Sequence, residues 1–265
     1  MTMKLFLLYL SPLLIFAKVH YAKVEPYNSV VLKSAVSGLV VDVDLDAEGT
    51  MVTGKRVIHI DDTLDKVNLS DTKQSIVFLE QMLGINQEIA SSLAGTVKRQ
   101  EGYFHRISKL STASKTQKDN AYSTFTSAKT QYLTIKEKIV SLNKQILDMK
   151  YKVSQLEDTL VKKSIIPGNR YLYKLMVRKG DFVAPGASLA QVQDASRAKL
   201  VLFLEPEELK NIETKIVFIN EKRTSYKVGK VWKVADDKFI SSYRAEIYIP
   251  APENEFSKLV KVEIK

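Results

Sequence analysis

The segment from Gly49 to Arg56 is the part of the sequence that comes nearest to a catalytic motif. Its two glycines and its lysine follow the spacing of a phosphate-binding loop. That motif needs a serine or threonine directly after the lysine, to hold Mg²⁺, and a helix N-terminus that faces the phosphates. Arg56 stands in the hydroxyl position, and the apolar run from Val57 to Ile60 favours a strand instead of a helix. We therefore expect no nucleotide site.

Carboxylates and histidines are the remaining candidates for chemistry. Asp42, Asp44 and Asp46 alternate with apolar residues, which indicates the exposed face of a strand and not a calcium site. The three histidines are far apart, and the absence of cysteine excludes disulfides, thiol catalysis and cysteine-based metal sites. No Ser-His-Asp signature or carboxylate pair stands out. We expect no catalytic residue, no metal site and no cofactor.

The strongest structural pattern lies between Phe125 and Leu160. Apolar side chains are spaced alternately by three and four positions over five heptads, and polar residues fill the other faces. A repeat of 3.5 residues keeps one stripe of a helix against a partner helix and winds a left-handed coiled coil. The stripe consists of Phe125, Ala128, Tyr132, Ile135, Ile139, Leu142, Ile146, Met149, Val153, Leu156 and Leu160.

A partner helix is predicted just upstream, where a weaker pattern keeps the same period. Asn86 and Gln100 stand at core positions of this arm and are expected to fix its register. Ser114 followed by Gln117 fits the capping box that starts a helix. We predict two antiparallel helices, at about 64–109 and 115–162, of which the second is roughly 70 Å long. The core positions of the first arm are Ile76, Leu79, Leu83, Asn86, Ala90, Leu93, Val97 and Gln100.

The sequence on both sides of this hairpin favours β-structure. Residues 30–46 alternate in period two, and short strand patterns recur at 57–60, 171–177, 182–186 and 188–192. The two flanks also resemble each other, which predicts two β half-units that close on one another and hold the ends of the hairpin together. The matching positions are Gly49, Val52, Gly54 and Val57 in the first flank and Gly180, Val183, Gly186 and Leu189 in the second.

The remainder, residues 195–265, favours a small β-barrel of five or six strands, with one helical turn at 207–212. The expected strands are residues 199–204, 215–219, 226–234, 244–249 and 259–264.

The first seventeen residues indicate export. Lys4 precedes an apolar run from Leu5 to Phe16, after which come Ala17 and the polar Lys18. This is the pattern of a secretory signal peptide, and the run is shorter than the ~20 residues that span a bilayer. We expect a mature chain outside the cytoplasm, with an uncleaved anchor as the alternative. The formal net charge of +10 adds nucleic acid and anionic membrane surfaces as candidate partners.

A half-unit, a coiled-coil hairpin, a matching half-unit and a barrel, in this order, resemble the HlyD-type periplasmic adaptors, also called membrane fusion proteins. The matching segments are residues 36–40 with Glu48 and Gly49, and residues 177–186. The resemblance implies an elongated α+β fold: a lipoyl-like β-sandwich, interrupted by a long antiparallel coiled-coil hairpin and followed by a small β-barrel. The implied divisions are a signal peptide at 1–17, a first lipoyl-like half at 18–62, the hairpin at 63–163, a second half at 164–194 and the barrel at 195–265.

The resemblance implies a binding protein and no enzyme. Such an adaptor links an inner-membrane transporter, of RND or ABC type, to a TolC-like outer-membrane channel in the periplasm, and its copies form a hexameric or trimer-of-dimers ring. The family's tip pattern places an arginine, a leucine four residues later and a serine seven residues after that. Arg106 and Leu110 fit it, whereas Ser114 fits only with a turn three residues shorter.

Each tip residue also has a structural interpretation. Ser114 can serve as a helix cap, and Arg106 and Leu110 can be ordinary exposed positions near a helix end. Six lysines and arginines against one acidic residue lie between Lys98 and Lys118, which fits either a solvated surface or steering toward an acidic channel rim.

Two other functions are compatible with parts of the sequence. A lipoate or biotin carrier would place its modified lysine on a tight turn between the two β half-units, but about a hundred residues of coiled coil occupy that position. A basic coiled-coil protein could bind nucleic acid. Cleavage of the leader on export would exclude cytoplasmic nucleic acid as the partner.

Overall fold

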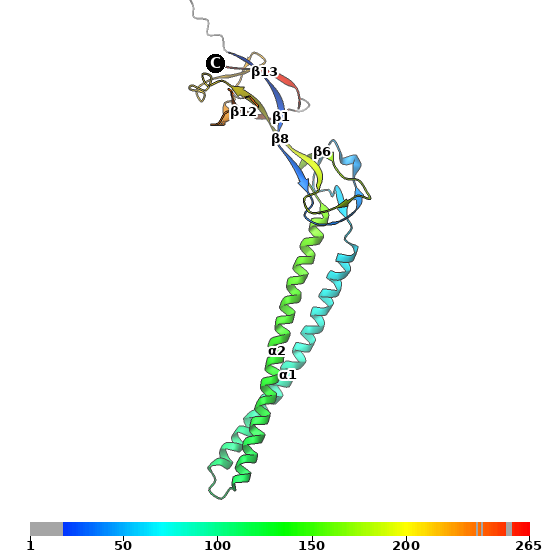
Figure 1. Ribbon diagram of the computed structural model, residues 1–265, viewed down its shortest axis with the longest axis vertical. Coiled ribbons are helices and arrows are strands. Elements are labelled where there is room, and N and C mark those ends of the chain that lie inside the picture. Colours follow the sequence, from blue (N-terminus) through cyan, green and yellow to red (C-terminus); the bar gives the residue numbers. More distant parts are fainter. Residues whose placement is uncertain (1–17, 237, 240, 253–255) are drawn as a thin grey trace, which may run out of the picture.

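The computed structural model describes residues 18–236, 238–239, 241–252 and 256–265. The expected signal peptide, residues 1–17, lies outside them. The molecule is elongated, with a helical hairpin at one end, a β-body against the base of the hairpin and a second β-body at the far end (Figure 1). The prediction of a mixed fold with one long helical hairpin is confirmed.

The hairpin consists of α1 (Thr63–Lys109) and α2 (Lys115–Lys163), of 47 and 49 residues. All the predicted core positions of both helices are partly or fully buried, so the predicted seam is confirmed. Asn86, at one of them, is only 5% exposed. Its side-chain amide donates to the carbonyl of Met82 in its own helix, at 2.7 Å, so this polar core residue is satisfied without a hydrogen bond across the seam.

Two ion pairs cross between the helices and show their register. Lys73 lies 2.8 Å from Glu157, and Lys150 lies 3.2 Å from Glu80. All four side chains are about half exposed, so each pair stabilises the hairpin by at most about 1 kcal/mol. The apolar seam therefore supplies most of the free energy that holds the two helices together.

The first β-body is built from both flanks of the hairpin. Its core is a single cluster that includes Val40, Ile58, Leu172 and Val192, all with no exposed surface. One sheet has the order β5-β4-β2-β7, and β3 pairs with β6. The strands are β2 (Gly38–Val43), β3 (Thr50–Val52), β4 (Ile58–Ile60), β5 (Ser164–Ile165), β6 (Arg170–Leu175) and β7 (Phe182–Val183).

The two flanks close on one another as predicted. Gly38 and Leu39 of β2 pair with β7, and all three residues of β3 pair with β6. The four glycines of the sequence repeat all have positive φ angles, which glycine adopts without steric cost. These glycines are Gly49 (80°), Gly54 (64°), Gly180 (98°) and Gly186 (90°).

The second β-body is a sheet with the order β10-β9-β13-β1-β8-β12-β11. Its core includes Val24, Leu200, Leu202, Ile247 and Val262. The described pairings end at β10 and β11 and form an open path, so closure into a barrel stays a prediction. The strands are β1 (Val19–Lys33), β8 (Ser188–Leu204), β9 (Val217–Ile219), β10 (Lys222–Arg223), β11 (Val228–Val231), β12 (Tyr243–Pro250) and β13 (Leu259–Ile264).

One carboxylate is buried in this second body. Glu246 is 5% exposed and accepts hydrogen bonds from Arg244 (2.8 Å), Tyr248 (3.0 Å) and Lys199 (3.3 Å). Burial alone would raise the pKa of Glu246, but these three donors outweigh burial and hold the pKa below its ordinary value. The charge is therefore paired within the sheet.

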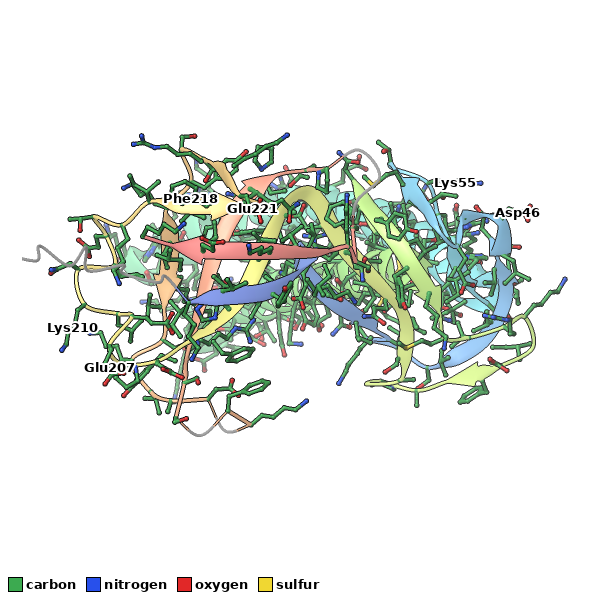
Figure 2. All side chains as sticks on the ribbon, turned by 90° about the horizontal axis from the view of Figure 1, so that it is seen from above. Asp46, Lys55, Glu207, Lys210, Phe218 and Glu221 are labelled. Carbon is green, nitrogen blue, oxygen red and sulfur yellow. The ribbon has the colours of Figure 1, made fainter. Side chains whose placement is uncertain are left out.

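Two long strands belong to both bodies, which differs from the predicted divisions. Residues 19–23 of β1 pair with β13 in the second body, although we expected them in the first half-unit. The expected boundary at residue 194 falls inside β8, which runs unbroken for 17 residues. Seen along the long axis, Asp46 and Lys55 of the first body lie on the opposite side of the view from Glu207 and Lys210 of the second (Figure 2). β1 and β8 therefore connect the two bodies as a two-stranded link, whose pairing shifts register between Pro26 and Asn28.

The helix expected at 207–212 is wrong. The segment folds into successive turns, in which Glu208 and Ile212 donate to carbonyls three residues earlier. Asn211 has a φ of 56°, which no helix tolerates, so the segment stops before a helical turn can propagate. No helix among the described residues combines the length and the apolar character needed to cross a membrane.

Candidate functional site

The hairpin tip is a five-residue turn between two well-defined helix ends. α1 ends at Lys109, and the extended Leu110 donates its backbone N–H to the carbonyl of Ile107. α2 begins after Ser114, whose hydroxyl accepts from the N–H of Gln117 at 3.2 Å, while the Gln117 side chain accepts from the N–H of Ser114 at 2.9 Å. The predicted capping box is confirmed. It orders the turn without any contact to a partner.

An aromatic cluster closes the seam just below the turn. The ring of Phe104 lies 5.3 Å from that of Tyr122 and stacks on that of Phe125 at 6.1 Å, with Ala121 buried between the helices. Our sequence analysis did not include Phe104 or Ala121 in the seam. The signal was available, because position 104 continues the heptads of α1 and position 121 those of α2.

All three predicted docking residues lie at the tip, but their contacts differ. Arg106 and Leu110 are exposed and line one shallow groove of about 560 Å³ on the α1 side. Ser114 is also exposed, but its hydroxyl already accepts the capping hydrogen bond. The structure thus brings Arg106 and Leu110 together and leaves Ser114 across the turn with a structural role. Whether any of the three docks onto a channel stays a prediction.

The electrostatic character of the tip is basic. The six lysines and arginines between Lys98 and Lys118 make no ion pair with any other described residue, and five of the six are exposed. Leu110 and Tyr103 add exposed apolar surface beside this charge. The tip can therefore attract an acidic surface and then bury a small apolar contact against it.

The base of the hairpin is held by a set of polar contacts. Asp61 accepts from the N–H and the hydroxyl of Thr63, at 3.1 and 2.8 Å, which lowers the pKa of Asp61 and satisfies one free N–H in the first turn of α1. Lys163, at the end of α2, donates to the Asp61 carbonyl at 2.7 Å and forms an ion pair with Asp65. These contacts join both helices to the first β-body at one point, which limits rotation of the hairpin about its base.

Two apolar stripes remain exposed outside the seam. Both keep the heptad period, which is typical of a helix that packs along another helix. Every side chain in them is at least 40% exposed, so no described residue covers either stripe. The α1 stripe consists of Phe78, Met82, Ile85 and Ile89, and the α2 stripe of Leu133, Val140 and Leu147.

The two stripes lie on opposite edges of the hairpin. The pair between Glu80 and Lys150 marks one edge, and the α2 stripe follows that edge, since Leu147 is three positions before Lys150 on the same helix face. Met82, on the same helix as Glu80, occupies heptad position g, which flanks the seam on the side opposite to Glu80. The α1 stripe therefore follows the other edge of the hairpin. Because Glu80 is level with Lys150, Leu147 is level with Leu83, and the stripes overlap along the hairpin axis.

The residues that resembled chemical motifs pair with neighbouring charged side chains of the β-bodies. Lys55, of the segment like a phosphate-binding loop, forms an ion pair with Asp44 at 2.5 Å, and a strand follows it. His20 and His59 lie beside Glu208 (2.7 Å) and Asp62 (3.4 Å), in different β-bodies. Within the described ranges, no group of three His, Cys, Asp or Glu side chains is close enough to hold a metal ion.

Comparison with known proteins gives a likeness in structure alone. No protein-family model and no curated protein matches the chain. The crystal structure of MacA from Actinobacillus actinomycetemcomitans superposes with a TM-score of 0.74 and 17% identity, over 94% of this chain and 78% of MacA. The membrane fusion protein Spr0693 from Streptococcus pneumoniae R6 gives 0.66 and 11%, over 94% of this chain and 99% of Spr0693.

A third solved structure bears on the hairpin. A MacA–MexA chimera that contains the α-hairpin domain of Pseudomonas aeruginosa MexA gives a TM-score of 0.62 and 16% identity, over 94% of this chain and 81% of the chimera. At these identities the likeness shows the fold. The predicted resemblance to membrane fusion proteins is therefore confirmed at the level of the fold, across both β-bodies and the hairpin.

Replacing the helix cap tests how much the tip depends on Ser114. Ser114→Ala removes the acceptor for the Gln117 N–H and should destabilise the first turn of α2 by about 1 kcal/mol. Amide hydrogen exchange at residues 115–118 should become several-fold faster, with no change in the β-bodies. Ser111→Ala, in the same turn, is the matched control. Equal exchange in the two variants would contradict the capping role.

Proposed function

We propose that this chain is the periplasmic adaptor of a tripartite efflux or secretion system. It links an inner-membrane transporter, of RND or ABC type, to a TolC-like outer-membrane channel, and it performs no chemistry itself. The observation that carries the proposal is the hairpin: two helices of 47 and 49 residues that project from a β-body and expose a basic tip. In this role the chain is exported to the periplasm and is held at the inner membrane by its transporter.

The length and construction of the hairpin support a spacer role. At 1.5 Å per residue, α2 spans roughly 73 Å, which is far more than a compact chain of this size needs for its own core. The seam is continuous from Asp65 and Lys163 at the base to Phe104 and Phe125 at the tip. A strut of this kind transmits a fixed distance between two partners.

The tip supports docking onto an acidic and partly apolar surface. Arg106 brings an unpaired guanidinium, and Leu110 brings a side chain that is 49% exposed into the same groove. A channel rim with carboxylates would gain charge-assisted hydrogen bonds from Arg106. Leu110 would then fill a small apolar depression next to them.

The edge stripes support a ring of adaptor copies. Because the α1 stripe and the α2 stripe lie on opposite edges and overlap in level, the α1 edge of one hairpin can pack along the α2 edge of the next with the hairpins parallel. Such contacts are heterologous and continue from copy to copy until the ring closes. A ring would bury both stripes and surround a central passage, as the proposed conduit requires.

Crosslinking from the tip tests the docking step. The chain has no cysteine, so Leu110→Cys or Arg106→Cys places a single thiol at the tip. In cells that carry a candidate channel, each variant should form an adduct with the channel on addition of a thiol-to-amine crosslinker. Lys144→Cys, exposed halfway along α2, should form none. An adduct from position 144 without one from the tip would contradict docking through the tip.

A double-cysteine variant tests the ring. Ile85→Cys with Leu147→Cys should give a ladder of dimers, trimers and larger species with a short bis-maleimide, because each copy presents both thiols to different neighbours. Either single variant should give no ladder. Gln81→Cys with Lys144→Cys, which point away from both edges, is the control. Dimers from Ile85→Cys alone would indicate a two-fold contact between α1 edges and would rule out the ring geometry.

A further inference from the structure

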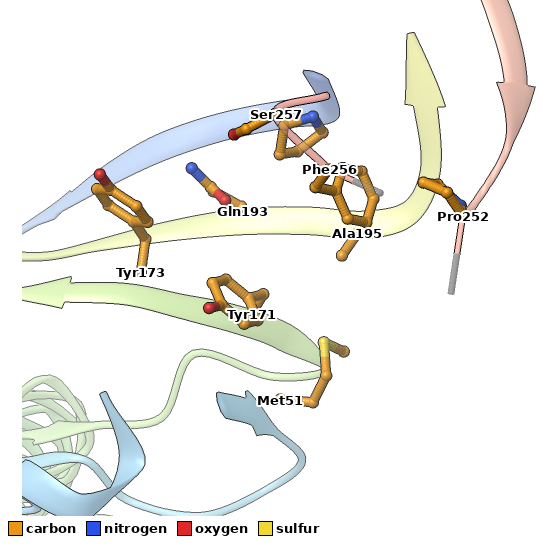
Figure 3. A pocket seen from close by; sticks show the side chains of 9 residues that line it. Met51, Tyr171, Tyr173, Gln193, Ala195, Pro252, Phe256 and Ser257 are labelled. Carbon is orange, nitrogen blue, oxygen red and sulfur yellow. The ribbon is translucent and has the colours of Figure 1, made fainter. Parts of the chain in front are cut away.

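A cleft of about 610 Å³ lies where the two β-bodies meet (Figure 3). Its floor is the outer face of β8 and β6, which contribute Gln193, Tyr171 and Tyr173. Met51 of β3 stands at one side of the cleft, and Phe256, just before β13, stands at the other. The adaptor role proposed above does not use this cleft.

Strand register explains why these side chains gather on one face. Leu172 and Val192 pair with each other and are fully buried in the core of the first β-body. Their neighbours in sequence therefore point to the opposite face. Gln193 pairs with Tyr171, and Tyr171 pairs with Met51, so three side chains from three strands form one row across that outer face.

The opposite wall is fixed by the backbone. The N–H of Ser257 donates to the carbonyl of Val24 at 2.8 Å, and the N–H of Val24 donates to the carbonyl of Lys258 at 2.9 Å. These two hydrogen bonds tie the segment that carries Phe256 to β1. The floor and the Met51 wall thus belong to paired strands, and the Phe256 wall is hydrogen-bonded to β1 through Ser257.

The lining has the composition of a site for a small organic molecule. The rings of Tyr171, Tyr173 and Phe256 supply flat apolar surface, and Met51 and Tyr173 are each 52% exposed. The Gln193 amide and the Ser257 hydroxyl make no side-chain hydrogen bond with any other residue that the structure describes, so both are available to a ligand. The volume lies within the range of about 300–1,000 Å³ that is typical of ligand pockets.

The charges near the cleft select against an ion. A groove that continues from the cleft is lined by Lys23, Glu25 and Lys199, together with residues of the cleft itself. Lys199 forms an ion pair with Glu246 at 3.3 Å, and the remaining Lys23 and Glu25 have opposite charges. The cleft itself is lined by no charged side chain, so its chemistry fits an uncharged ligand.

We propose that this cleft binds a flat, uncharged aromatic amphiphile of drug-like size. Its ring system would lie among Tyr171, Tyr173 and Phe256, and its polar end would bond to Gln193 and Ser257. The site lies on the link formed by β1 and β8, so an occupied cleft would also connect the two β-bodies through the ligand. This recognition needs neither a transporter nor a channel.

The uncharged dye N-phenyl-1-naphthylamine is a suitable probe, because its fluorescence increases in apolar surroundings. Titrated with the purified full-length chain, it should show saturable binding to one site per copy. Tyr173→Ala should weaken binding by about tenfold, as the loss of an aromatic anchor typically does. Tyr151→Ala is the matched control, since Tyr151 is an exposed tyrosine on α2, far from the cleft. This variant should bind the dye with unchanged affinity.

Two further variants keep the test independent of folding and of the hairpin. Met51→Lys places a charge in an exposed apolar wall and should also weaken binding, while circular dichroism stays unchanged. Ile85→Glu, in the α1 stripe, should leave dye binding intact. Full binding in Tyr173→Ala and Met51→Lys, or its loss in Ile85→Glu, would overturn the proposal. Because the tip is not involved, either result leaves the adaptor function to the crosslinking experiments.

Discussion

The heptad seam between α1 and α2 is the interaction on which the rest of the molecule depends. A single helix of nearly fifty residues has little stability of its own in water, because it lacks a partner for its apolar stripe. Zipped together, the two helices bury that stripe along their whole length and become stiff. The ion pairs beside the seam add register but little free energy. The basic tip is presented at a fixed distance from the β-bodies only because the seam holds.

The β-bodies keep that strut in place. The two flanks of the hairpin pair with each other through β2–β7 and β3–β6. The start of α1 and the end of α2 are therefore joined to one rigid unit. Lys163 joins the end of α2 to Asp61 and Asp65 at the start of α1. β1 and β8 then carry the connection into the second body without a flexible linker. The hairpin and the two β-bodies thus form one elongated unit, which suits a protein that links two distant partners.

The parts of this structure that sequence alone predicts are those set by local patterns. Heptads place α1 and α2 to within one residue, and the Ser114–Gln117 capping box fixes the start of α2. Long-range pairing was harder to predict. β8 reads as two strands because polar residues at 193–197 interrupt its apolar alternation, and β1 joins β13 across almost the whole chain. The exposed stripes were not predicted, because they occupy heptad positions outside the a and d positions that define the seam. The cleft was not predicted, since it arises from the register of β3 with β6 and β8 and from the segment before β13, which is distant from them in sequence.

The most direct test of the central claim is small-angle X-ray scattering from the monomeric fraction of the mature chain. A compact chain of this length would have a radius of gyration of about 18 Å. The zipped hairpin predicts a value far above that, together with a maximum dimension well beyond the roughly 70 Å length of the hairpin. A radius of gyration near 18 Å, with a symmetric distance distribution, would show that the helices fold back onto the β-bodies and would contradict the account.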